Sequence, residues 1–124
     1  MGLLHEIVFD CEHPANLARF WAGCLDGFEV RPYDDAEIAR LASLGLTPET
    51  DPHVMVDGPD LKLCFQKTDT ASAAKNKLHV DVVTESRADV VKRLCQLGAS
   101  VVREFKSNTW LRDPEGNDFC LTDP

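Results

Sequence analysis

The chain repeats one order of elements twice within 124 residues, and this repetition limits the folds that it can adopt. Each half is predicted to hold a strand, an amphipathic helix that ends at glycine, and then about three further strands. The first strand and helix are expected at residues 4–11 and 14–27, and their counterparts at 78–83 and 86–98. The pattern therefore predicts an internal duplication of two small modules that mix helix and strand.

The remaining elements follow from alternating apolar residues that are bounded by turn signals. Expected strands cover residues 28–33, 53–56, 61–66, 100–105, 110–112 and 118–122, and a short helix covers 35–44. The segment from Thr68 to Lys75 is polar and rich in alanine, which is typical of a linker. We therefore expect one domain over 1–124, with module 1 at about 3–67, a linker at about 68–76 and module 2 at about 77–123.

The first helix and the cysteines are expected to contribute to the core. One apolar face of this helix consists of residues at helical spacing, namely Leu17, Phe20, Trp21, Cys24 and Leu25. The five cysteines are odd in number and widely spaced, and no pair has the Cys-x-x-Cys spacing. Because free cysteine is often buried, Cys24 and Cys95 on helix faces are expected to be reduced structural thiols.

Two strands are predicted to present chemically useful side chains. Residues 113–117, Asp-Pro-Glu-Gly-Asn, predict a tight turn because proline presets φ and glycine tolerates positive φ. The strand after this turn should place Phe119 on one face and Cys120 on the other. In the first strand of module 2, the same alternation should turn His79 and Asp81 away from the core.

Composition excludes several classes of partner. The net charge of -8 and a pI near 4.8 argue against nucleic acid or an anionic membrane surface. No apolar run approaches the roughly 20 residues that span a bilayer. The N-terminus, Met-Gly-Leu-Leu-His-Glu, lacks the basic flank and long apolar stretch of a signal peptide, which favours the cytoplasm.

Four stretches carry a resemblance to a known family, namely residues 7–21, 75–81, 94–99 and 110–120. In this order they resemble glyoxalase-like domains of the vicinal oxygen chelate superfamily, from about Leu3 to Leu121. The superfamily includes glyoxalase I, extradiol dioxygenases, fosfomycin-modifying enzymes, epimerases and bleomycin resistance proteins. The resemblance implies an α+β fold of two βαβββ modules, whose sheets form an open barrel-like cup around a cleft.

The resemblance also implies positions for a divalent metal, because catalytic members take ligands from the first and last strands of each module. His79 falls on this position in the first strand of module 2. For module 1, Glu6 fits the register and His5 fits the ligand type, and a β-bulge would decide between them. Cys64 and Cys120 stand where members similar to glyoxalase I carry glutamate.

Two interpretations of this set remain open. Zinc accepts sulfur, nitrogen and oxygen ligands, so Glu6, Cys64, His79 and Cys120 can form a zinc site. Magnesium, manganese and iron prefer sites richer in oxygen. Alternatively, His79 lines a cleft without metal, and cysteine after Gly-Asn-x-Phe belongs to the ordinary pattern of the subgroup. A nucleophilic thiol at Cys120 with His79 as its base is a further hypothesis.

Contacts to a small-molecule ligand are expected from His79, Asp81, Gln66, Trp110 and Arg112. Trp110 can stack on a flat ligand, and Arg112 can pair with a carboxylate or phosphate. The alternatives are that Trp110 packs within the sheet and that Arg112 is a solvated surface charge.

The sequence thus leaves two functions open. The first is binding of a small organic molecule, cationic ligands included, without a well-formed metal site of the glyoxalase I type. The second is a divalent-metal-dependent lyase, isomerase or dioxygenase of the same superfamily. A homodimer is also open, because exposed strand edges favour association.

Overall fold

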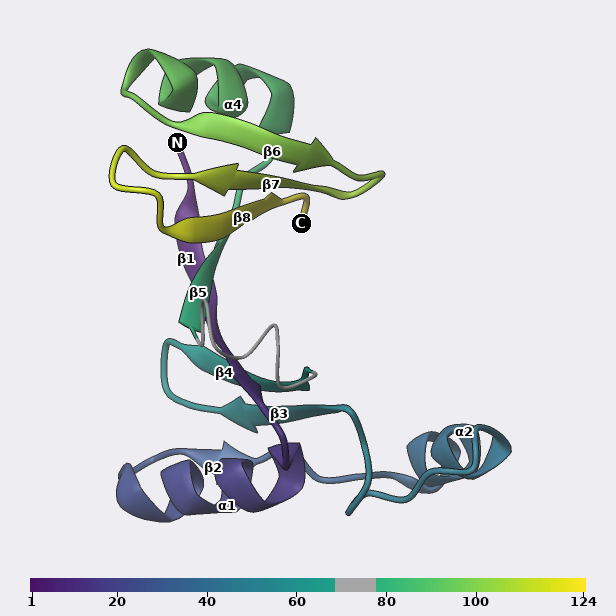
Figure 1. The fold of residues 1–124 in the computed structure, drawn as a ribbon. Helices are drawn as coiled ribbons and strands as arrows, with labels where there is room; N and C mark the ends of the chain where they lie inside the picture. Colours follow the sequence, from purple (N-terminus) through teal and green to yellow (C-terminus); the bar gives the residue numbers. More distant parts are fainter. Residues whose placement is uncertain (69–77) are drawn as a thin grey trace. The chain divides into compact units, whose positions relative to one another are not determined.

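The computed structural model describes residues 1–68 and 78–124, which form an α+β fold (Figure 1). Tertiary contacts group the chain into two compact units, Val8–Lys77 and Met1–Ile7 with Leu78–Pro124. Strand β1 (Leu3–Cys11) contributes residues to both units. The expected linker lies outside the described residues apart from Thr68, and the expected module boundaries stay a prediction.

The unit Val8–Lys77 contains an antiparallel sheet and two helices. After β1 come α1 (Pro14–Cys24), β2 (Glu29–Val30), α2 (Asp35–Ser43), β3 (His53–Asp57) and β4 (Lys62–Lys67). The strand order is β2-β3-β4, and α1 contacts all three strands (Figure 1). β2 is shorter than predicted because Pro32 has no N–H with which to continue the ladder.

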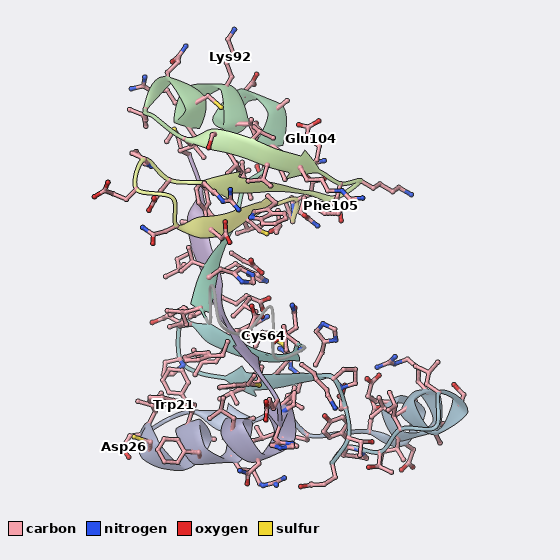
Figure 2. The ribbon with its side chains drawn as sticks, viewed as in Figure 1. Trp21, Asp26, Cys64, Lys92, Glu104 and Phe105 are labelled. Carbon is pink, nitrogen blue, oxygen red and sulfur yellow. The ribbon has the colours of Figure 1, made fainter. Side chains whose placement is uncertain are left out.

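Apolar side chains of β3 and β4 form the core of this unit, and Phe65 is fully buried among them. The ring of Phe9 on β1 stacks on Phe65 with centroids 5.0 Å apart. The ring of Trp21 on α1, labelled in Figure 2, also contacts Phe9, with centroids 5.8 Å apart. The half-buried Trp21 therefore belongs to the core, as the helical spacing predicted.

The buried face of α1 otherwise differs from the prediction. Its buried residues are Pro14, Ala15 and Ala18, whereas Phe20 is 61% exposed and Cys24 is exposed. Small side chains let the helix approach the sheet closely, so the larger residues lie on its flank. Cys95 is exposed as well, so the prediction of buried thiols is wrong for both helical cysteines.

The second unit repeats this order of elements without a counterpart of α2. It contains β5 (Leu78–Val83), α4 (Arg87–Gln96), β6 (Ser100–Glu104), β7 (Asn108–Arg112) and β8 (Asp118–Thr122). The strand order is β5-β8-β7-β6, with β5 parallel to β8 and the other neighbours antiparallel. Because the first and last strands pair in parallel, the connection between them passes through α4 and the hairpin of β6 and β7. Among the described residues, no helix is long and apolar enough to cross a membrane.

One face of this sheet packs against α4. Val90 of α4, Leu111 of β7 and Leu121 of β8 form the buried centre, and Val82 and Phe119 pack against it. These strand residues alternate with the polar residues of β5 and β8, so the predicted division of the two faces is confirmed.

A single arginine ties the start of α4 to the hairpin and the C-terminal segment. Arg87 Nε donates to Asp123 Oδ1 at 2.9 Å, and its two Nη atoms donate to Thr109 Oγ1 and to the backbone oxygens of Phe105 and Lys106. The side chain of Ser86, the residue before α4, makes no capping hydrogen bond. Ser86 instead donates its backbone N–H to Thr84 Oγ1 at 3.4 Å, so the residue before the helix is held from outside it.

Two glycines of the unit Val8–Lys77 give a matched test of its packing. A Cβ added at Gly58 would overlap the ring of Phe28, whereas Gly23 of α1 faces open space. We expect Gly58→Ala to lower the free energy of unfolding by about 1–3 kcal/mol through overpacking. Gly23→Ala should raise it by roughly 0.5–1 kcal/mol because alanine favours helix. Urea denaturation of both variants measures this, and equal effects would contradict the described packing.

Candidate functional site

Several candidate site residues lie on one face of the sheet in the second unit, the face that points away from α4. Asp81 of β5 and Trp110 of β7 both lie directly opposite Cys120 of β8. Arg112 of β7 lies opposite Asp118, which is two residues before Cys120 on β8. Because paired residues of neighbouring strands share a face, Asp81, Cys120 and Trp110 form one row across three strands.

Three potential ligand atoms converge in this row. The side chains of His79, Asp81 and Cys120 are each partly buried, and one ligand atom of each lies within 4.8 Å of the others. The spacing of two residues on β5 places His79 and Asp81 on one face, and the parallel register brings Cys120 beside Asp81. The sequence predicted His79 and Cys120 as possible metal ligands, but it assigned Asp81 only to ligand binding.

Asp81 is a mostly buried carboxylate with one oxygen that lacks a hydrogen bond from the described residues. Its side chain is 15% exposed, and Oδ1 is buried without a hydrogen-bond partner among the described residues. His79 Nε2 lies 3.5 Å from this oxygen, which permits an ion pair when the imidazole is protonated but gives no aligned hydrogen bond. A buried acceptor without a donor costs about 1–3 kcal/mol, and more when it is charged. Asp81 Oδ1 is therefore an acceptor whose hydrogen-bonding capacity the described residues leave unused.

Cys120 is held in its protonated form. Burial, the negative charge of Asp81 and that of Asp118 together raise the pKa of the Cys120 thiol to about 11. At neutral pH the residue is therefore a thiol, and a thiol is a far weaker nucleophile than a thiolate. These surroundings disfavour the hypothesis of a Cys120 nucleophile activated by His79.

Trp110 and Arg112 are linked to each other and to Asp118. The Arg112 guanidinium lies 5.8 Å from the centroid of the Trp110 ring, and its Nε donates to Asp118 Oδ1 at 2.9 Å. The Arg112 side chain is half exposed, so the pair contributes modestly to stability. Arg112 is thus anchored by a ring and a carboxylate, and it is not simply a solvated charge.

The other predicted site residues lie elsewhere in the chain. The buried Cys64 (Figure 2) and Gln66 belong to β4 in the unit Val8–Lys77. Gln66 Nε2 donates to Asp10 Oδ1 at 3.5 Å. Glu6 is partly buried and His5 is exposed on β1. The four-residue zinc set, and the choice between Glu6 and His5, stay predictions.

The sequence matches the glyoxalase-like domain family over residues 6–122. The chain belongs to this family. No curated protein is detectably similar to it. A superfamily member from Vibrio splendidus, described as a glyoxalase/bleomycin resistance protein/dioxygenase, is 11% identical with a TM-score of 0.58 over 100% of both chains.

Two further solved structures have the same fold. A variant of methylmalonyl-CoA epimerase from Streptomyces coelicolor, in complex with 2-nitronate-propionyl-CoA, is 19% identical with a TM-score of 0.58, over 97% of this chain and 95% of that one. A hypothetical protein from Bacillus halodurans is 11% identical with a TM-score of 0.66, over 99% and 94%. The chain therefore has the fold of the glyoxalase/bleomycin resistance/dioxygenase superfamily, as its sequence predicted.

The raised pKa of Cys120 predicts a measurable thiol titration. Thiolate absorbance near 240 nm should show a component with a pKa of about 11 that disappears in Cys120→Ser. Because the folded pKa lies above the ordinary value of 9.0, the associated stability is present below pH 9 and is lost as pH rises toward 11. Asp81→Asn should lower the pKa of this component because it removes a neighbouring negative charge. Titration of the Cys120 component near the ordinary thiol value of 9.0 would contradict the described burial.

Proposed function

We propose that this member of the glyoxalase-like family binds a small organic ligand on the face of β5, β8 and β7, with a cationic or N–H group of the ligand at Asp81. The observation that carries the proposal is the buried Asp81 Oδ1, which has no hydrogen-bond partner among the described residues. A donor placed there would recover the hydrogen bond that the folded chain lacks.

The neighbours of Asp81 support the same ligand class. The Cys120 thiol is neutral at physiological pH, so it adds no competing charge to the row. Trp110 lies opposite Cys120 and offers a ring against which a flat or cationic group can pack. The net charge of -8 also favours the approach of cations over that of anions.

The test pairs organic cations with uncharged counterparts. Benzamidine and tryptamine should raise the melting temperature in a concentration-dependent way, whereas benzamide and tryptophol should not. At a ligand concentration of 100 times Kd, the stabilisation expected is about 2.7 kcal/mol. Equal shifts with charged and uncharged members of each pair would contradict a role for the Asp81 charge.

Asp81→Asn separates binding from stability. Without ligand, this variant should be more stable than the parent by roughly 1 kcal/mol, because it removes a buried charge that lacks a hydrogen bond. Its stabilisation by organic cations should disappear. Asp60→Asn, which removes an exposed charge from a turn in the other unit, is the matched control and should change neither property. Full stabilisation of Asp81→Asn by benzamidine would end the proposal.

A zinc site is the second candidate, because the ligand atoms of His79, Asp81 and Cys120 lie within 4.8 Å of one another. Nitrogen, oxygen and sulfur donors fit zinc, which would supply Lewis-acid polarisation of a substrate oxygen. His79, Asp81 and Cys120 would hold the ion, and Cys120 would lose its proton on binding. This candidate keeps open a metal-dependent lyase, isomerase or dioxygenase function.

Zinc binding has a signature in pH. Because the Cys120 pKa is about 11, uptake at pH 7–8 must release a thiol proton, and affinity should rise about tenfold per pH unit. Cobalt substitution should add a thiolate-to-metal absorption band that is absent from Cys120→Ser. Less than one tenth of an equivalent of zinc after titration, without such a band, would exclude this candidate.

The expected homodimer and cytoplasmic location stay predictions. The edge strand of the second unit, β6, is interrupted by a bulge between Val101 and Arg103. It also carries the charged residues Arg103 and Glu104, of which Glu104 is labelled in Figure 2. Bulges and charges at a sheet edge disfavour pairing with a second copy. If a dimer forms, we therefore expect another surface to mediate it.

A further inference from the structure

A hollow of about 510 Å³ lies in the unit Val8–Lys77, between α2 and β3. Its apolar wall includes Pro32, Ala36 and Met55. The volume falls within the range of roughly 300–1,000 Å³ that small-molecule sites occupy. Neither the family resemblance nor the polar row of the second unit accounts for it.

A buried carboxylate lines the hollow, and each of its two oxygens accepts a hydrogen bond. Asp51 is 5% exposed, and its Oδ2 accepts a hydrogen bond from Tyr33 Oη at 2.7 Å. Its Oδ1 accepts from the backbone N–H of His53 at 3.0 Å. Tyr33 thus directs its only proton to Asp51, and its remaining lone pair can accept a hydrogen bond.

The wall formed by α2 offers one donor and one acceptor. Arg40 uses Nε and Nη2 to bind both carboxylate oxygens of Glu37, at 3.1 and 2.6 Å, which leaves Nη1 for another acceptor. Asp34 Oδ1 caps α2 by accepting from the backbone N–H of Glu37, which leaves Oδ2 for another donor. Arg40, Asp34 and Tyr33 all line the hollow, so its lining residues include one unused donor, Arg40 Nη1, and two unused acceptors, Asp34 Oδ2 and Tyr33 Oη.

The charge of the lining restricts the ligand further. Arg40 is neutralised by Glu37, and Arg31 by Asp57, each in a bidentate pair. The carboxylates of Asp34 and Asp51 remain, so the lining is negative overall. Phosphates and dicarboxylates are disfavoured by this charge. A simple cation would gain nothing from Arg40 Nη1, whereas a ligand that also carries a carboxylate can use it.

We infer that this hollow binds a small zwitterion with an apolar body, of the α-amino acid class. The ligand carboxylate accepts from Arg40 Nη1, its ammonium group donates to Asp34 Oδ2 and Tyr33 Oη, and its side chain packs on Pro32, Ala36 and Met55. Every residue in this inference belongs to the unit Val8–Lys77. It therefore stands or falls independently of the proposal for Asp81.

Isothermal titration calorimetry with three matched probes tests the ligand class. L-Phenylalanine should bind with Kd of about 1 mM or tighter, whereas 3-phenylpropanoate and 2-phenylethylamine, which each lack one charge, should bind at least about tenfold more weakly. Comparable affinity for all three probes, or no heat from phenylalanine at roughly 10 mM, would overturn the inference.

Two pairs of variants locate the binding in this hollow. Ala36→Met places a larger side chain in the apolar wall and should abolish binding, whereas Ala39→Met, at an exposed position of α2 outside the lining, should not change it. Arg40→Gln should weaken phenylalanine binding about tenfold, because the loss of one charge-assisted hydrogen bond reduces affinity by roughly that factor. Its control is Arg19→Gln, which breaks an equivalent exposed bidentate pair with Glu49. Equal losses within either pair would overturn the inference.

Discussion

The parallel pairing of β5 with β8 is the constraint on which the second unit depends. Its register places Val82 beside Leu121 and Asp81 beside Cys120. The first pair points to α4 and closes the core, while the second points to the opposite face and starts the polar row. A shift of one residue would exchange these faces, burying carboxylate and thiol under α4. The apolar core therefore fixes the position of the candidate site.

The row of Asp81, Cys120 and Trp110 also contains a group whose burial destabilises the folded state. Asp81 Oδ1 is buried without a hydrogen-bond partner among the described residues, and its charge helps to keep Cys120 protonated. Folding stability alone would favour an apolar or neutral residue at this position. Strain of this kind is commonly tolerated where a ligand relieves it, which is why Asp81 rather than Cys120 is the centre of the proposed function.

Elements with strong alternation were predicted closely. The strands at 78–83 and 118–122 begin and end as expected, because each has one face against an apolar core. The face of α1 was misjudged at Phe20, since helical spacing identifies apolar residues but not how closely a helix approaches its sheet. The hollow under α2 left no sequence signal, as its residues are spread from Arg31 to Met55.

The sequence by itself determined the repeated order of elements and the family. It also showed that His79, Asp81 and Cys120 lie on the polar faces of strands whose apolar and polar residues alternate. These properties depend on local periodicity and composition, which are legible along a single chain. Only the tertiary structure decided that the three side chains converge, that Asp81 Oδ1 lacks a partner among the described residues, and that the Cys120 pKa rises. Register between strands and burial arise from contacts distant in sequence, so no local pattern specifies them.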